Sequence, residues 1–229
     1  MFFIPFLIAM VCGGVSAVVM LLVREKNGRN QLSNKRFLSD ILDAAKQAGK
    51  TPDFVRYCLV SSIFGFFMSI SWPLFSITLV RVLKASMLEI ALVSVVQGVS
   101  TIAFQSWAGK LADTIGRKPL LVIFRTGLFL VPIAYAFAPS IYLLMLFNVY
   151  LGFLTALGQA TVTAYILDVT PEENRGSFTA FYNLILGIVF FIGSLVGGYL
   201  SDFTIGLFGL TLGLQIAYMI SASGRFFGG

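Results

Sequence analysis

The chain has 229 residues, of which 58% are hydrophobic and 11% are charged, and its mean hydropathy is +0.91. A water-soluble domain could not cover this much apolar surface, so the composition excludes a soluble globular protein and indicates a membrane protein. The sequence contains no histidine, and its two cysteines, Cys12 and Cys58, stand far apart. Because histidine is the commonest metal ligand and no C-x-x-C spacing occurs, we expect no metal and no cofactor.

Seven apolar runs are long enough to cross a bilayer, because a hydrocarbon core of about 30 Å needs ~20 residues of helix. The runs are 2–23, 57–80, 85–108, 119–138, 141–166, 177–200 and 204–222. They are continuous and rich in Leu, Ile, Phe and Gly, without the alternation that strands of a membrane barrel show. The sequence therefore predicts an all-α membrane protein with seven transmembrane helices.

The basic residues predict how these helices are oriented. No basic residue precedes the first run, and Arg24, Lys26 and Arg29 follow it. This charge order is the reverse of a secretory signal, so we expect a retained helix with its amino end outside. Alternation from there assigns to the cytoplasm the segments 24–56, 109–118, 167–176 and 223–229. Of the 16 basic residues, all but Arg81 and Lys84 then lie in or beside a cytoplasmic segment, as the positive-inside rule requires.

The net charge of +6 is explained by this insertion and by contact with anionic lipid headgroups. We therefore expect lipid and not nucleic acid as a partner, and a multi-pass protein of the plasma membrane. The segment 24–56 is the only sizeable polar stretch, and Phe37, Ile41 and Ala45 stand at helical spacing in it. It contains either a short helix on the membrane surface or an ordinary solvated linker.

The six runs after this segment form two similar halves, 57–138 and 141–222. In both halves the second run leads into the pattern G-x-L-small-Asp, which begins at Gly109 in the first half and at Gly198 in the second. Because each half contains an odd number of helices, the two copies lie on opposite faces of the membrane. Chance is the weaker account of a four-position match at equivalent places, so the sequence predicts a 3+3 inverted repeat.

Residues 109–118 read G-K-L-A-D-T-I-G-R-K. This stretch resembles the cytoplasmic loop signature of the major facilitator superfamily, and the resemblance extends over nearly the whole chain. It implies the carboxyl-terminal half of such a transporter, with a six-helix bundle over 57–222 and a cytoplasmic tail over 223–229. Residues 1–23 then correspond to the last helix of the amino-terminal half, and 24–56 to the basic central loop.

Five helices of the family are absent ahead of Met1. A fragment, the product of a truncated gene and a half-size protein that pairs with a partner remain as explanations. We expect a fragment, because the first helix has no bundle of its own to contact. The expected partners are a small-molecule solute, the lipid bilayer, and either the missing amino-terminal half or a second half-size subunit.

The resemblance also implies a gate at the cytoplasmic surface, where charged residues hold the transporter closed while it faces outward. In the signature, Gly109 lets two helices approach and Gly116 allows a tight turn. Asp113 faces the amino end of a neighbouring helix and a basic partner, Arg117 or Arg175. A second pattern of the family follows in the next cytoplasmic loop, Asp168-x-x-Pro171-x-x-x-Arg175-Gly176. The predicted gate and motif residues are Gly109, Asp113, Gly116, Arg117, Lys118, Arg125, Asp168, Pro171, Arg175 and Gly176. The alternative is that these are loop charges that only set the topology.

Arg125 differs from the other predicted gate residues because it lies one to two turns inside the run 119–138. A charge there is costly unless it reaches the interface or finds a partner. Arg125 is close enough to the cytoplasmic surface for its head to reach the interface. We therefore expect it to belong to the interface or the gate, and not to contact the solute directly.

The transport path is expected along polar residues that face the missing half. Amides are costly in hydrocarbon unless they meet a partner or a wet cavity, so Gln97, Asn148 and Gln159 are the strongest candidates. The alternative for them is plain hydrogen bonding between helices. The predicted path residues are Ser69, Trp72, Gln97, Thr101, Asn148, Gln159 and Asn183. The spacings Gly193-x-x-x-Gly197 and Gly209-x-x-x-Gly213 instead predict close helix packing.

No Asp or Glu lies in the middle of any run, whereas a proton-coupled carrier needs a titratable group in the membrane. The coupling carboxylate is therefore in the absent half, or the transport is uncoupled. No P-loop, nucleophile elbow or pair of carboxylates occurs, so we expect no enzyme. We predict secondary active or facilitative transport of a small solute by alternating access. A neutral or amphipathic solute is favoured among drug-like compounds, sugars and organic anions. The alternative is a membrane scaffold or interaction protein that keeps the fold without transport.

Overall fold

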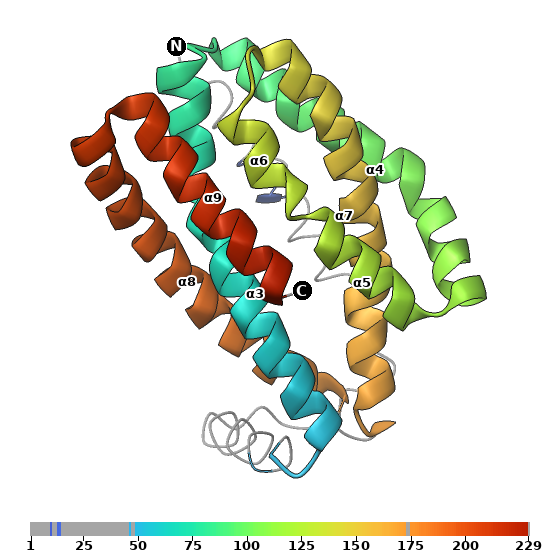
Figure 1. Cartoon of the computed structure of the whole chain (residues 1–229). Helices are drawn as coiled ribbons and strands as arrows, with labels where there is room; N and C mark the ends of the chain where they lie inside the picture. The colour runs from blue at the N-terminus through green and yellow to red at the C-terminus, as the bar shows by residue number, and fades with distance from the viewer. Residues whose placement is uncertain (1–9, 11–12, 15–45, 47–48, 173–174, 229) are drawn as a thin grey trace. The chain divides into compact units, whose positions relative to one another are not determined.

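The computed structural model of the chain describes residues 10, 13–14, 46, 49–172 and 175–228. The regular elements among them are all helices, in the order α3 (Pro52–Ile77), the π-helix η1 (Thr78–Val82), α4 (Met87–Ile115), α5 (Arg117–Gly127), α6 (Leu130–Ala136), α7 (Ile141–Val169), α8 (Arg175–Phe208) and α9 (Leu210–Gly228) (Figure 1). All of them belong to the second of the two units, Met1–Ser39 and Asp40–Gly229, into which the chain divides. The predicted all-α fold is confirmed for these residues. The predicted helix 1–23 and most of the loop 24–56 lie outside the described residues.

Five segments of the described chain are long and apolar enough to cross a membrane. They are Pro52–Val82, Met87–Ile115, Arg117–Ala136, Ile141–Val169 and Arg175–Phe208, and they correspond to the second through sixth predicted runs. Helix α9 completes a bundle of six membrane segments, but it has only 19 residues and contains Gln215 and Arg225. These two polar side chains lower the hydropathy of α9, which is not among the five candidate spans.

Helix α3 begins earlier than its apolar run. Pro52 stands in the first turn, where backbone N–H groups have no acceptor within the helix, so its missing N–H costs no hydrogen bond. Asp53 follows it at the positive end of the helix dipole. The predicted start at residue 57 was therefore too late, because hydropathy does not register the polar first turn of a helix. A second proline, Pro73, lies inside α3, and the last turns relax into the π-helix η1.

The signature segment 109–118, expected as a cytoplasmic loop, is mostly helical. Helix α4 starts with a capping box, in which Ser86 and Glu89 each bond the other's backbone N–H, and it continues through the signature to Ile115. The turn is confined to Gly116, whose φ of +94° and ψ of 159° are almost exclusive to glycine. The predicted role of Gly116 in a tight turn is confirmed.

The run predicted at 119–138 is divided into α5 and α6 by a break at Leu128–Phe129. Pro132 follows the break and lacks the N–H that would bond the carbonyl of Leu128 in a continuous α-helix. Helix α8 instead runs without interruption through Gly198 and turns only at Gly209, whose φ is +80°. The predicted end of this helix at residue 200 was wrong, because Ser201 and Asp202 interrupt the apolar run without interrupting the helix.

The end of the chain also differs from the prediction. Helix α9 continues to Gly228, so the segment 223–229, predicted as a cytoplasmic tail, is helical as far as it is described. In Figure 1 the carboxyl end of α9 lies part of the way along α3 and not beyond its end. Arg225 is therefore a residue of the bundle, and its 2% exposure shows that it is buried.

The helices pair as an inverted repeat requires. The most extensive contacts are those of α4 with α7 and of α3 with α8. In the repeat, α3 is equivalent to α7 and α4 is equivalent to α8. The pair α4 with α7 is therefore equivalent to the pair α8 with α3. Figure 1 shows the same arrangement, with α3 beside α8 and α4 beside α7. The second helix of each half also ends at a glycine with positive φ, Gly116 or Gly209.

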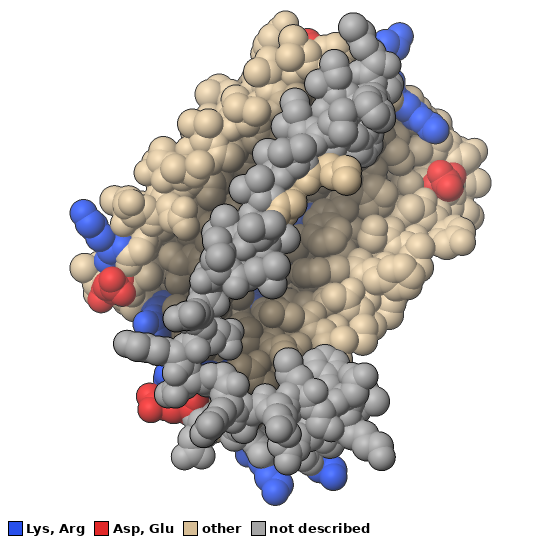
Figure 2. Space-filling view, turned by 180° about the vertical axis from the view of Figure 1, so that it is seen from behind, with Lys and Arg blue, Asp and Glu red and all other residues tan. Residues whose placement is uncertain are grey.

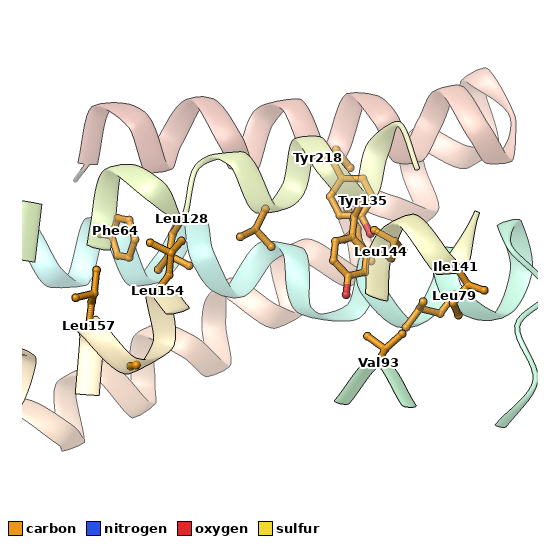
Figure 3. Close-up of a cluster of buried hydrophobic side chains, with 14 of the residues drawn as sticks. Phe64, Leu79, Val93, Leu128, Tyr135, Ile141, Leu144, Leu154, Leu157 and Tyr218 are labelled. Atoms are coloured by element: carbon orange, nitrogen blue, oxygen red, sulfur yellow. The ribbon is translucent and has the colours of Figure 1, made fainter. Parts of the chain in front are cut away.

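The larger buried cluster contains apolar side chains from every helix of the bundle except α8, whose Leu200 and Ile205 contact it from the side. Helix α8 contributes Phe178 and Tyr182 to a second buried cluster. Figure 3 shows Leu128, Leu154 and Leu157 gathered near Phe64, and a second group around Tyr135 and Tyr218. These contacts join residues far apart in the sequence. They hold the six membrane segments of the described chain as one bundle.

Glycines set the closest approaches between helices, but not all of the predicted ones do so. A Cβ added to Gly193 would lie 2.6 Å from the carbonyl oxygen of Phe66, and one added to Gly197 would lie 2.2 Å from that of Ile70. The spacing Gly193-x-x-x-Gly197 therefore packs α8 on α3, as predicted. Gly109 has open space at its Cβ position, so the prediction that it lets two helices approach was wrong for the described chain. In the second predicted spacing, Gly213 contacts Thr204 of α8, whereas Gly209 serves the turn.

Candidate functional site

A pocket of about 570 Å³ lies among helices α3 to α7 and α9, and we call it the central pocket. Its lining residues are Met68, Trp72, Phe75, Gln97, Phe124, Leu128, Val131, Tyr135, Leu151, Thr155, Gly158, Gln159, Val162, Thr163 and Arg225. The volume is within the range of about 300–1,000 Å³ that is usual for small-molecule sites. Figure 2 shows that one face of the molecule is hollowed, with mostly uncharged atoms in the hollow and some Lys or Arg atoms visible inside it.

The central pocket lies halfway along the helices. Met68 is one residue past the midpoint of the span Pro52–Val82, and Thr155 is the midpoint of Ile141–Val169. Apolar and aromatic walls meet a few polar side chains there, which is the usual composition of a ligand site. The depth is also where solute sites lie in transporters built from repeats.

Three of the seven predicted path residues line the central pocket, and they come from three helices. Trp72 belongs to α3, Gln97 to α4 and Gln159 to α7. Trp72 is 42% exposed, and its ring centroid lies 5.0 Å from that of Phe190. The structure thus brings together two amides and an indole from segments far apart in the sequence.

The other four predicted path residues do not line this pocket. Asn148 is 1% exposed, and its Nδ2 donates to the carbonyl of Leu144 at 2.7 Å and to the hydroxyl of Tyr135 at 3.4 Å. Asn148 therefore follows the alternative of hydrogen bonding between helices. Ser69 and Thr101 donate to carbonyls of their own helices, and Asn183 is exposed on α8.

Arg225 is the residue of the pocket that the sequence analysis missed. Its Nη1 donates to the carbonyl of Leu128 and its Nη2 to the carbonyl of Met68, both at 3.0 Å. Its Nε is buried and has no hydrogen-bond partner in the described part of the chain. None of the ion pairs among the described residues involves it.

A proline explains part of why an arginine is accepted at this depth. Because Pro132 has no N–H, the carbonyl of Leu128 loses its usual helical donor and is bonded instead by the N–H of Val131 at 3.3 Å and by Arg225. In a membrane a carbonyl without its helical donor must be satisfied by other groups. Arg225 also donates to the carbonyl of Met68 in α3, and Ser221, one turn earlier on α9, donates to the carbonyl of Phe67.

Arg125 lies in the last turn of α5, packs against the amino-terminal half of α3 and is buried, with 5% exposure. Its guanidinium lies 5.2 Å from the ring centroid of Tyr57 and 5.5 Å from that of Phe64, and it donates to the hydroxyl of Ser61. It thus finds partners inside the bundle, where π faces attract a cation. The expectation that its head reaches the membrane interface was therefore wrong.

A second pocket lies beside Arg125. This α3–α5 pocket has a volume of about 310 Å³ and includes Asp53, Arg56, Lys118 and Tyr165 in its lining. Aromatic rings pack next to it: Tyr57 stacks on Tyr182 at 5.4 Å between centroids and contacts Tyr165 at 4.8 Å. Helices α3, α7 and α8 are therefore held together by tyrosines at this end of the bundle, which is the predicted cytoplasmic end.

The charged residues of the two signature patterns meet at the same end. Arg117 forms an ion pair with Asp168, and its Nη1 also donates to the carbonyl of Ala164 at 3.3 Å. The first residue of α5 is thereby joined to the last turn of α7. These side chains are 37% and 49% exposed, so the ion pair is accessible to solvent at the end of the bundle.

The predicted partners of Asp113 are engaged elsewhere. Arg175 donates from Nε to the carbonyl of Leu167 at 3.2 Å and lies 3.4 Å from a carboxylate oxygen of Glu172. Asp113 is exposed, and none of the ion pairs between described residues includes it. The structure therefore does not bring Asp113 together with Arg117 or Arg175. Lys118 lines the α3–α5 pocket, and the remaining motif residues, Pro171 and Gly176, make no contact that assigns them a role.

Comparison with known proteins identifies the family of this bundle. A model of the Major Facilitator Superfamily matches residues 57–227. The tetracycline resistance protein, class H, of Pasteurella multocida is 32% identical over 101 residues, which are 44% of this chain and 25% of that protein. The galactose-proton symporter of Escherichia coli K12 is 32% identical over 95 residues, 42% of this chain and 19% of the symporter. The multi-drug resistance efflux pump PmrA of Streptococcus pneumoniae is 33% identical over 119 residues, 50% of this chain and 28% of the pump.

The matched segments span between 19% and 28% of the length of these relatives. No solved structure matches the chain. The helical bundle, its apolar spans and the extent of the family match agree with one another. The protein is thus an integral, multi-pass membrane protein, and the chain belongs to the Major Facilitator Superfamily.

Proposed function

We propose that the chain is part of a secondary active or facilitative transporter that moves a small solute across the plasma membrane by alternating access, with the solute held in the central pocket. The observation that carries this proposal is the meeting of Trp72, Gln97 and Gln159 in one pocket at the middle of the bundle. Amides at that depth are costly unless they face a partner or a cavity. A solute site gives them that cavity.

The relatives support transport without selecting the solute. Their names refer to tetracycline resistance, a galactose-proton symporter and multi-drug efflux, which are chemically different tasks. We further propose that the amino-terminal half of a complete transporter, or a second half-size subunit, supplies the wall of the pocket opposite this bundle. The alternative is a membrane scaffold or interaction protein that keeps the fold without transport. Such a protein would need no pocket that opens to water.

The cytoplasmic gate is proposed at the end of the bundle that carries Arg117. Its ion pair with Asp168 joins α5 to α7, and the tyrosines beside Arg125 join α3, α7 and α8. Movement of these ends would open or close the path from the central pocket to the cytoplasm. Asp113, Lys118 and Arg175 lie at the same end and are proposed as further gate residues.

The proposal is tested by labelling a cysteine placed in the central pocket. Gln159→Cys, in a chain without Cys12 and Cys58, should react with a membrane-impermeant thiol reagent in both right-side-out and inverted vesicles, because alternating access opens the pocket to each side in turn. Ala156→Cys is the matched control: Ala156 lies one turn earlier on α7 and is 0% exposed, so it should stay unlabelled. Protection of Gln159→Cys in both kinds of vesicle would favour the scaffold.

The same background tests the gate. Arg117→Gln removes the ion pair with Asp168 and should speed labelling of Gln159→Cys from the cytoplasmic side, since one contact of the closed gate is lost. Arg56→Gln is the control, because the one ion pair that Arg56 forms among the described residues is with Asp53 of its own helix, at the same end of the bundle. Equal labelling rates in the two variants would show that the pair with Asp168 is not part of the gate.

A further inference from the structure

A positive charge lies in the wall of the central pocket at the middle of the membrane span. Arg225 is 2% exposed and bonds the carbonyls of two other lining residues, Met68 and Leu128. A guanidinium always carries its charge in proteins and offers five N–H donors. In Arg225, Nη1 and Nη2 each donate a hydrogen bond to a carbonyl. The buried Nε has no acceptor in the described chain.

The described bundle supplies no negative charge to balance this one. Its carboxylates stand toward the ends of their helices, and all but Glu89 are exposed; they are Asp53, Glu89, Asp113, Asp168, Glu172 and Asp202. Carbonyl dipoles lower the cost of the buried cation but leave its charge uncompensated. An uncompensated charge at this depth is costly and is characteristic of a substrate pathway.

The rest of the central pocket is complementary to an anion attached to an apolar body. Gln97 and Gln159 add amide donors to the same pocket, and Trp72, Phe75 and Phe124 add aromatic rings to its lining. A carboxylate could accept charge-assisted hydrogen bonds from the arginine and neutral ones from the amides. Its apolar part would contact the rings and leave water.

We infer that the central pocket selects amphipathic organic anions, and that Arg225 is the residue that recognises their carboxylate. This inference rests on the proposed function of the central pocket as the solute site, and it narrows the neutral or amphipathic solute that the sequence alone favoured to an amphipathic anion. Arg225 then has two tasks, since it bonds the carbonyls of Met68 and Leu128 and presents a positive charge to the solute.

The experiment compares two probes of the same shape, 4-phenylbutyrate and its neutral amide, 4-phenylbutyramide. Binding to the purified full chain in detergent is measured by isothermal titration calorimetry, with titrations into empty micelles subtracted. The unmodified chain should bind the carboxylate at least tenfold more tightly than the amide, because one charge-assisted hydrogen bond contributes about a tenfold or larger factor. Equal affinity, tighter binding of the amide, or no binding of either probe would overturn the inference.

Variants then assign the preference to Arg225. Arg225→Met should abolish the preference for the carboxylate, and Arg225→Lys should keep part of it, because a lysine retains the charge but loses the planar donor geometry. Ser221→Ala is the matched control: it removes a neighbouring bond from α9 to a carbonyl of α3 without changing the charge, and should keep the full preference. An unchanged preference in Arg225→Met would overturn the inference.

Two features keep the result decisive. If Arg225→Met does not fold, the comparison of the two probes on the unmodified chain and the partial preference of Arg225→Lys still decide the matter. Failure of the inference is also distinct from failure of the proposed function. If both probes bind equally and Gln159→Cys is labelled from both sides, the central pocket is a solute site without a preference for anions.

Discussion

At the scale of single residues, two adjacent glycines of α8 have different tasks. A Cβ on Gly197 would lie 2.2 Å from the carbonyl oxygen of Ile70, whereas a Cβ on Gly198 would meet nothing within 4 Å. The contact at Gly197 is with backbone, so no side-chain rotation can relieve it. The close approach of α8 to α3 therefore depends on the missing side chain at one of the two positions.

Gly197→Ala should lower the free energy of unfolding by about 1–3 kcal/mol, the usual cost of overpacking a close contact. Gly198→Ala is the matched control, and it should leave stability unchanged or raise it by up to about 1 kcal/mol, because alanine is the better helix former. Denaturant unfolding in mixed micelles, followed by far-ultraviolet circular dichroism, gives both values. Equal effects of the two substitutions would contradict the close packing of α3 and α8.

Arg225 shows what the sequence could and could not predict at this scale. Its apolar run ends at residue 222, so a reading based on hydropathy assigns Arg225 to a polar tail. The position becomes acceptable inside the bundle only because Met68 and Leu128 present carbonyls there, and hydropathy contains no information on those partners. Phe226 and Phe227, which follow it, were a signal that the helix continues. The amides Gln97 and Gln159, in contrast, were predictable from the cost of burying them in hydrocarbon.

At the scale of elements, the existence of the helices was predictable and their ends were not. Apolar runs of about 20 residues identify membrane helices because of the bilayer's thickness. The ends depend on other physics: Pro52 and Asp53 extend α3 into polar sequence, and Gly209 ends α8 long after the apolar run is interrupted. The break between α5 and α6 was missed because a proline affects a carbonyl four residues earlier.

The two glycines of the signature provide a test at this scale. Gly116→Ala should destabilise the protein by about 1–3 kcal/mol, because alanine is strained in the backbone conformation that the turn between α4 and α5 requires. Gly109→Ala should be neutral or stabilising by up to about 1 kcal/mol, since Gly109 is inside α4 with open space at its Cβ position. Both values follow from the same unfolding measurement. A larger loss from Gly109→Ala would mean that another part of the protein packs on that glycine.

At the scale of the whole molecule, the pairing of helices connects the repeat to the proposed mechanism. Helix α4 packs on α7, and α3 packs on α8, so each half contributes to both pairs and neither half forms a bundle alone. The central pocket takes lining residues from both halves, among them Trp72 and Gln159. A solute bound there would contact both repeats at once, which would couple its binding to any movement of one against the other.

The orientation of this bundle in the membrane rests on its basic residues and can be measured directly. We expect Lys50→Cys to be shielded from an impermeant thiol reagent in intact cells, and Met87→Cys to be labelled, in a background without native cysteines. Met87 is 78% exposed at the start of α4, and it is preferable to Ser86, whose side chain caps that helix. Lys50 is exposed just before α3, one membrane crossing away. Permeabilised cells should label both positions, which shows that each cysteine is reactive.

The opposite pattern in intact cells would place Arg117 and Asp168 on the outer surface and remove the proposed cytoplasmic gate, because their ion pair lies at the same end of the bundle as Lys50. The preference of basic residues for the cytoplasmic side would then be violated by nearly every lysine and arginine of the chain, so we expect the first pattern.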